Sequence, residues 1–189
     1  MSKFDTFTTF LIHNWRLFTK TDIEKYFIAE KAESLVFIIL GIAAIVLAIV
    51  LFFFVKANWH KGAAIPFLII GIIHLAASYT VYSRSDKDRQ NLVYAYDMNP
   101  SLLKTKELPR MEKVNKTFTI IKIAEVSLFL IGLAVFFYFK NDDTNAFWAG
   151  IGVALAIEAV LTLGGDMVAS KRASLYTDGL KAFIAQQKL

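Results

Sequence analysis

Four long blocks of apolar residues, separated by polar segments, dominate the pattern along this chain. They cover residues 35–55, 63–82, 118–139 and 147–169, and no charged side chain interrupts the first two. A helix needs about 20 apolar residues to cross a hydrocarbon core of roughly 30 Å. The pattern therefore predicts an all-α, polytopic membrane protein with four transmembrane helices, paired as two hairpins over residues 21–82 and 118–169.

Two shorter apolar stripes flank the hairpins. In residues 1–20, apolar side chains recur at three- and four-residue steps, at Phe4, Phe7, Leu11, Trp15 and Phe18. Residues 170–189 alternate lysines with apolar side chains, at Leu180, Phe183 and Ile184. A short helix with one apolar and one basic face is typical of a membrane interface. We therefore expect an amphipathic interfacial helix at the start of the chain and an amphipathic cytoplasmic tail at its end.

The segment over residues 83–117 is too long to be an unstructured connection, so we expect it to be helical. Its first part extends the second span through Tyr96. Asn99 and Pro100 mark a stop and a restart, because proline fits the first turn of a helix. Upstream, Thr21 and Glu24 have the spacing of a capping box, which predicts that a helix begins there and runs into the first span.

Lysine and arginine are distributed unevenly around the spans. Seventeen of the 21 lie before the first span, in residues 83–117 or after the last span. The two short loops contain only Lys56, Lys61 and Lys140. The positive-inside rule then puts both termini and the middle segment in the cytoplasm. We expect an integral protein of a bacterial inner membrane, whose net charge of +5 reflects orientation and not nucleic-acid binding.

The composition narrows the chemistry. The sequence has no cysteine, which excludes disulfides, iron–sulfur clusters and thiol catalysis. Three histidines, His13, His60 and His74, are too few for a multi-haem bundle. No phosphate-binding glycine loop, HExxH motif, GxSxG motif or Ser/His/Asp grouping is present. The pattern favours a function other than catalysis and predicts neither a cofactor nor a bound metal.

An ungapped shift of 84 residues superposes the two hairpins and aligns LFFFVK at 51–56 with VFFYFK at 135–140. The shift also aligns three polar pairs: His74 with Glu158, Ser78 with Thr162, and Tyr82 with Asp166. Residues four apart share one face of a helix, so each hairpin would carry a polar stripe at matching depth. The shift indicates either an internal duplication about an axis along the membrane normal, or two hairpins of similar length with coincident polar residues.

Glu158 is the strongest candidate functional residue, because it lies near the middle of the fourth span. An ionised carboxylate at this depth is costly, so the side chain should be neutral, paired or facing water. One hypothesis is a carboxylate that binds a proton or a cation. The other is a protonated glutamate that hydrogen-bonds a neighbouring helix and stabilises the bundle.

The other candidates are the polar side chains within the spans that could meet Glu158: His74, Asp166, Glu125, Thr162, Ser78, Tyr82 and Lys122. His74 could relay protons to Glu158, supply one metal ligand, or bridge two helices as a neutral ring. Glu125 and Asp166 could form the cytoplasmic end of a pathway, or Glu125 could pair with Lys122, whose long side chain reaches the inner interface. A zinc site would require four side chains to converge: His74, Glu125, Glu158 and Asp166.

Two functions follow from this pattern. The first is a small protein for proton- or cation-coupled transport, with its polar site between the hairpins and a homo-oligomer completing the pathway. The second is a non-enzymatic interaction protein, such as a partner subunit, a regulator or an immunity-type protein against a membrane-acting toxin. Both require the lipid bilayer, and the second also requires a protein partner.

Overall fold

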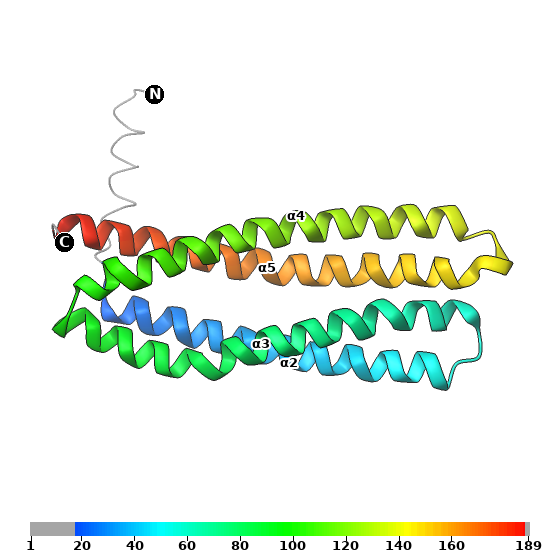
Figure 1. The fold of residues 1–189 in the computed structure, drawn as a ribbon, viewed down its shortest axis with the longest axis horizontal. Coiled ribbons are helices and arrows are strands. Elements are labelled where there is room, and N and C mark those ends of the chain that lie inside the picture. The colour runs from blue at the N-terminus through cyan, green and yellow to red at the C-terminus, as the bar shows by residue number, and fades with distance from the viewer. Residues whose placement is uncertain (1–17, 188–189) are drawn as a thin grey trace, which may run out of the picture.

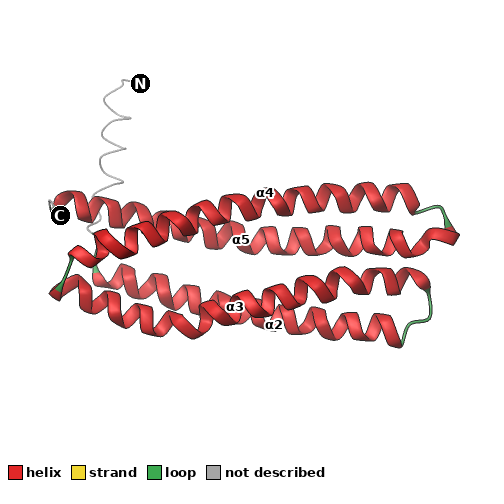
Figure 2. Cartoon of the chain, viewed as in Figure 1, coloured by secondary structure: helices red, strands yellow, loops and turns green. Residues whose placement is uncertain are grey.

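The computed structural model describes residues 18–187, which are helical apart from short connections and contain no strand (Figures 1 and 2). The long helices are α2 (Lys20–Phe53), α3 (Asn58–Met98), α4 (Leu108–Phe139) and α5 (Ala146–Gln186). A π-helical turn, η1 (Leu103–Glu107), leads into α4, and a 3₁₀ turn, η2 (Asp143–Asn145), precedes α5. Each of the four long helices is long and apolar enough to cross a membrane, which confirms the predicted all-α class and the four apolar spans.

The four helices lie along one another as two pairs. α2 packs along α3, α4 packs along α5, and α3 and α5 form the main contact between the pairs. The connections 54–57 and 140–145 lie at one end of the molecule, which we call the loop end (Figure 1). The start of α2, the α3–α4 connection and the end of α5 lie at the opposite, terminal end.

The start of α2 lies one residue earlier than the sequence predicts. The backbone N–H and the hydroxyl of Thr19 both donate to the Asp22 carboxylate at 2.9 Å. Thr19 is therefore the residue that caps the helix, and the predicted pair of Thr21 and Glu24 lies inside its first turns. In the first turn of a helix the backbone N–H groups have no partner within the helix, so a carboxylate at this position satisfies them. The predicted interfacial helix over 1–20 lies almost entirely outside the described residues.

The predicted cytoplasmic tail is not a separate helix, which corrects the sequence analysis. α5 continues without a break from the fourth apolar block to Gln186. The stripe formed by Leu180, Phe183 and Ile184 is buried inside the bundle. An amphipathic pattern shows that one face is covered, and here the other helices cover it in place of the lipid interface.

The largest hydrophobic core lies at the terminal end, away from the apolar blocks. It contains Phe18, Ile23, Tyr26, Phe27, Leu103, Met111, Ala173, Tyr176, Leu180, Phe183 and Ile184. The Tyr26 and Tyr176 rings stack with centroids 4.2 Å apart, and the Tyr96 and Phe183 rings stack at 4.9 Å. Aromatic side chains bury the most area per residue, so this core fixes the terminal end of all four helices.

The apolar halves of the helices pack through small residues. At the loop end, Gly62 of α3 lies against the backbone of Phe147, and Gly150 of α5 lies against the backbone of Trp59. Most large apolar side chains in these halves point outward and are exposed. This arrangement is typical of helices in lipid, where small residues allow close backbone contact.

Buried positions recur between α3 and α5 at a spacing of 88 residues. Both helices contain 41 residues. Six buried residues of α3 have a buried counterpart 88 positions later: Gly62 and Gly150, Ala64 and Gly152, Pro66 and Ala154, Gly71 and Ala159, Ser85 and Ala173, Ala95 and Phe183. The reciprocal contacts at the loop end follow the same spacing, since Gly62 meets Phe147 and Gly150 meets Trp59.

The predicted shift of 84 residues fits only the first helix of each pair. Three buried residues of α2 have a buried counterpart in α4 at that spacing: Phe27 and Met111, Gly41 and Glu125, Ala48 and Gly132. The connection between α4 and α5 is longer than the one between α2 and α3. At the 84-residue spacing α4 also ends two residues later than α2, and this extension together with the two extra residues of the connection moves the register of the second helices by four positions. In that register His74 corresponds to Thr162 and not to Glu158.

A glycine substitution tests the close contact between α3 and α5. In Gly150→Ala, the added methyl group would collide with the backbone oxygen of Trp59, which no side-chain movement relieves. We expect a loss of about 2 kcal/mol or more of stability. The measurement is the unfolding midpoint of the purified protein in detergent, followed by tryptophan fluorescence.

Gly164→Ala is the matched control in the same helix, because nothing lies within 4 Å of a methyl group at that position. Alanine favours the helix by about 1 kcal/mol over glycine, so the midpoint should stay constant or rise. Equal midpoints for the two variants would contradict the close contact.

Candidate functional site

The strongest candidate residue, Glu158, is a buried residue of α5. Only 6% of the residue is exposed, and its carboxyl has no hydrogen bond or ion pair within residues 18–187. Thr162 and Asp166 follow on the same face of α5 at four-residue steps, and Thr162 is also buried. The hydroxyl of Thr162 donates to the backbone oxygen of Ala159 at 3.2 Å.

Glu125 of α4 lies beside this stripe. It is 7% exposed, and its carboxyl faces Thr162 and Asp166. Its Oε2 is buried and has no hydrogen-bond partner among the described residues. Two carboxyl groups at this separation repel each other when both are ionised, and a shared proton or a bound cation removes the repulsion. The structure therefore brings together three of the predicted site residues: Glu125, Thr162 and Asp166. They lie on the terminal side of Glu158.

Lys122 lies at the terminal side of these acids. Its ammonium group donates to the Ser170 hydroxyl at 3.1 Å and is also close to Glu125 and Asp166. Asp166 further faces Glu33 of α2, whose carboxylate forms an ion pair with Arg172. We call the side chains of Glu158, Thr162, Asp166 and Glu125 the acid track, which ends at Lys122 and at the pair of Glu33 and Arg172.

His74 does not join the acid track. Its ring packs edge-on against Phe37 of α2, with centroids 5.4 Å apart and planes at 88°. The same Phe37 ring lies against Gly165 of α5, so it occupies the space between α3 and α5 at this level. The prediction of a proton relay from His74 to Glu158 therefore finds no contact that would support it.

The two other candidates on α3 lie toward the terminal end. Ser78 is half-buried one turn beyond His74, and the Tyr82 ring lies 4.8 Å below the Lys31 ammonium group. In the described part of the chain, no three His, Cys, Asp or Glu side chains come close enough to hold a metal ion. The predicted polar residues of α3 thus pack against α2, and those of α5 pack against α4.

The sequence analysis missed a second set of buried charges near the terminal end. Glu30 lies just outside the first apolar block, and only 7% of it is exposed. Its carboxylate accepts hydrogen bonds from Tyr26 at 3.2 Å, Ser85 at 3.1 Å and Arg84 at 3.3 Å. These bonds join α2 to α3, so Glu30 is a structural residue whose partners are far away in sequence.

Glu107 and Arg110 form the other buried charge pair. Both oxygens of Glu107 accept from the Arg110 guanidinium at 2.7 Å. Burial, together with the nearby carboxylates of Glu30 and Glu107, raises the pKa values of Tyr26 and Tyr176, so both phenols remain neutral donors. The three-residue spacing of Glu107 and Arg110 in a helical segment was the one signal that could have identified this pair from sequence.

Three substitutions of glutamate by glutamine separate structural from functional acids. Glu107→Gln removes the charge that partners a buried guanidinium, so we expect a loss of about 2–4 kcal/mol. Glu158→Gln removes a carboxyl without a partner in the described residues, and Glu125→Gln removes one that faces the Asp166 carboxyl, so the stability of both variants should equal or exceed that of the wild type. Unfolding midpoints in detergent measure all three, and a large loss in Glu158→Gln would indicate that Glu158 stabilises the bundle.

Comparisons with protein-family models, with curated proteins and with solved structures found no match to this chain. The acid track and the packing around it are therefore the basis for assigning a function. Its distinctive feature is a buried carboxyl, Glu158, without a partner in the described residues.

Proposed function

We propose that this chain is an integral membrane protein that binds a proton or a small cation at the acid track and couples it to transport. The four spans would cross the membrane as two hairpins, with both termini in the cytoplasm. Support for this orientation comes from the seventeen lysines and arginines at the terminal end and in the middle segment. Trp59 and Trp148 at the loop end suit the opposite interface, where amphipathic rings are enriched.

The observation that carries the proposal is the unpartnered carboxyl of Glu158. In the apolar interior of a membrane protein, ionisable side chains are rare and mark pathways for ions and protons. A structural glutamate in this position would donate or accept a hydrogen bond from a neighbouring helix, as Glu30 does at the terminal end. Glu158 has no such bond within the described residues, which favours binding of a transient partner.

The two helix pairs provide an internal comparison. We infer that they arose by duplication, with a spacing of 84 residues for the first helices and 88 for the second. In this register, the first pair has Gly41, Ile70 and Ser78 where the second has the acids Glu125, Glu158 and Asp166. The first pair has the same pattern of buried positions without these acids, so packing alone does not require them.

The order of side chains along the acid track suits access from the cytoplasm. From Glu158 to Asp166 is eight residues, or about 12 Å along α5. Glu125 bridges the gap from α4, and Lys122 and Arg172 stand where the fourth span ends. A proton could move along carboxyl and hydroxyl groups in this order, and a homo-oligomer would complete the route to the other side.

The alternative function is a membrane interaction protein, and one observation favours it. The best-packed part of the molecule is the terminal end, where the aromatic core and the buried pairs of Glu30 and Glu107 lie. A rigid bundle outside the membrane is a suitable surface for a partner subunit, a regulator or a toxin. In this case the unpartnered acids would contact the spans of that partner.

Flux in liposomes tests the proposed transport. We expect the wild-type protein to conduct protons or a monovalent cation across a pH series, and Glu158→Gln to abolish this flux. Glutamine at position 158 cannot exchange a proton, so the track loses its deepest titratable group, while Glu125 and Asp166 stay unchanged. The measurement uses a pH-sensitive dye for protons and an ion-sensitive dye for sodium and potassium.

Glu24→Gln is the matched control, because Glu24 is exposed near the start of α2, and its flux should equal that of the wild type. Full flux through Glu158→Gln would overturn the assignment of the track. Tight liposomes from folded wild-type protein would exclude transport, and co-purification of a partner would then support the alternative.

A further inference from the structure

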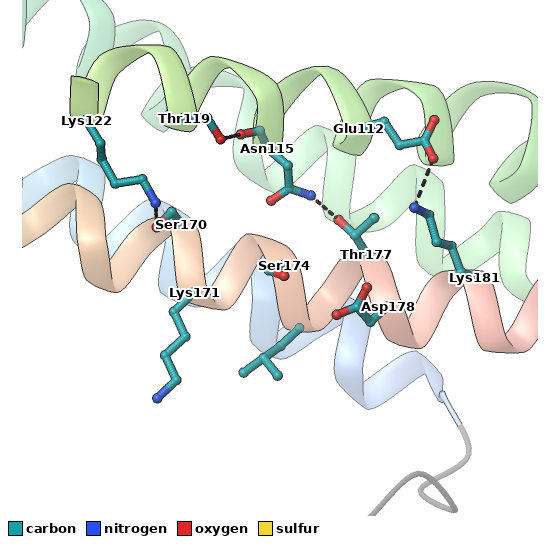
Figure 3. A pocket seen from close by; sticks show the side chains of 11 residues that line it. Glu112, Asn115, Thr119, Lys122, Ser170, Lys171, Ser174, Thr177, Asp178 and Lys181 are labelled. Atoms are coloured by element: carbon teal, nitrogen blue, oxygen red, sulfur yellow. Dashed lines mark hydrogen bonds and ion pairs between the residues drawn. The ribbon is translucent and has the colours of Figure 1, made fainter. Parts of the chain in front are cut away.

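A groove between α4 and α5 begins where the spans end, next to the end of the acid track at Lys122. It has a volume of about 780 Å³. Its walls come from 112–122 of α4 and 170–181 of α5, and Figure 3 shows both helices lining it with polar side chains. Asn115 donates to the Thr177 hydroxyl at 2.7 Å, so this bond closes the floor of the groove at its middle.

The charges in this groove are ordered along its length. Lys122 and Lys171 lie at the end next to the spans, together with the hydroxyls of Ser170 and Ser174. Lys171 is exposed and has no partner within residues 18–187. The acids line the far end, where Glu112 is neutralised by Lys181 at 3.1 Å. The end next to the spans therefore has two ammonium groups: that of Lys171 has no partner in the described residues, and that of Lys122 is shared with Ser170, Glu125 and Asp166.

A second groove continues the same face into the apolar halves of α4 and α5. It has a volume of about 410 Å³, and its lining is entirely apolar: Phe129, Leu133, Phe136, Phe137, Val153, Ala156, Ile157, Val160 and Leu161. On α4, residues 112, 115, 119, 122, 126, 129, 133 and 136 form one stripe of three- and four-residue steps through both grooves. From Lys122 to Phe129 is about 10 Å along the helix.

The first helix pair shows why the polar groove is open. At the spacing of 88 residues, Tyr82 and Asp86 of α3 correspond to Ser170 and Ser174 of α5. There, Asp86 pairs with Lys31, and the Lys31 ammonium group lies 4.8 Å from the centre of the Tyr82 ring. Large and paired side chains fill the strip between α2 and α3, whereas two serines leave it open between α4 and α5.

We propose that these two grooves together bind one anionic phospholipid of the inner leaflet. The phosphate lies against the ammonium group of Lys171 at the span end of the polar groove, and one acyl chain follows the apolar groove past Phe129 and Ile157. An ammonium group and hydroxyls donate to phosphate oxygens, and the inner leaflet supplies anionic lipid at this depth. The proposal rests on the membrane topology proposed above but not on transport.

Native mass spectrometry of the purified protein in detergent tests this site, with phosphatidylglycerol and phosphatidylcholine as probes. We expect one molecule of phosphatidylglycerol to bind tightly and phosphatidylcholine to bind more weakly. Lys171→Glu should lower the affinity for phosphatidylglycerol by about tenfold, because each lysine near an anionic lipid contributes about 1 kcal/mol. Lys122 is left unchanged, because it also lies beside the acid track.

Lys116→Glu is the control for general surface charge, since Lys116 is exposed on α4 next to Asn115 but does not line the groove. Its affinity should stay close to that of the wild type. Leu133→Trp fills the apolar groove and should lower the affinity for the lipid without changing the charge of the protein. Equal losses in Lys171→Glu and Lys116→Glu would overturn the site in favour of general surface attraction.

Two further measurements identify the ligand class and distinguish this proposal from the proposed transport. Glycerol phosphate, which has the headgroup without chains, should fail to displace the lipid, and full displacement would make the groove a simple anion site. Glu158→Gln should bind phosphatidylglycerol as the wild type does. Loss of flux in that variant with normal lipid binding therefore supports both proposals, and absence of lipid selectivity overturns only this one.

Discussion

Close contact between helix backbones is the constraint on which this structure depends. Apolar side chains gain little free energy from facing each other in place of lipid, because lipid is as apolar as leucine. The apolar halves therefore rely on small residues, above all Gly62 and Gly150 where α3 crosses α5. At the terminal end, water makes burial favourable, and the aromatic core around Tyr26 and Tyr176 fixes the helices there.

This division explains how the buried acids fall into two kinds. Glu30 and Glu107 lie in the terminal core, where arginine and hydroxyl groups saturate their oxygens and join neighbouring segments. Glu158 and Glu125 lie on helices that are already fixed at both ends, so their position does not depend on bonds of their own. A carboxyl that is held by the backbone around it can gain or lose a proton or cation without a change in the fold.

The sequence was sufficient for features that depend on local composition. The length of the apolar blocks predicted the four helices, and the extension of the second block past Tyr96 agrees with the end of α3 at Met98. Features that depend on long-range contacts were not predictable. The stripe at Phe183 and Ile184 shows that one face is covered, but periodicity cannot distinguish a lipid interface from a protein core. Glu30 was judged from its closeness to charged neighbours in sequence, and its partners Arg84 and Ser85 lie on another helix.

The candidate site was predictable in part for the same reason. The four-residue steps of Glu158, Thr162 and Asp166 follow from helix geometry, so their common face needed no structure. The depth of His74 relative to Glu158 depended on an ungapped alignment. A longer α4 and a longer connection to α5 together shift that alignment by four residues, and the ring of Phe37 takes the place expected for a partner.

The departures from the register of the two pairs concentrate in the second one. Acids replace Gly41 and Ile70 in α4 and α5, and serines replace Tyr82 and Asp86 in α5. The acids of the first pair, Glu30 and Asp86, are bonded to side chains of the same pair. Glu158 in the second pair has no such partner among the described residues, and a groove stays open between α4 and α5. Partnered acids fix neighbouring helices, whereas the site proposed for the second pair depends on a carboxyl that no helix contact occupies.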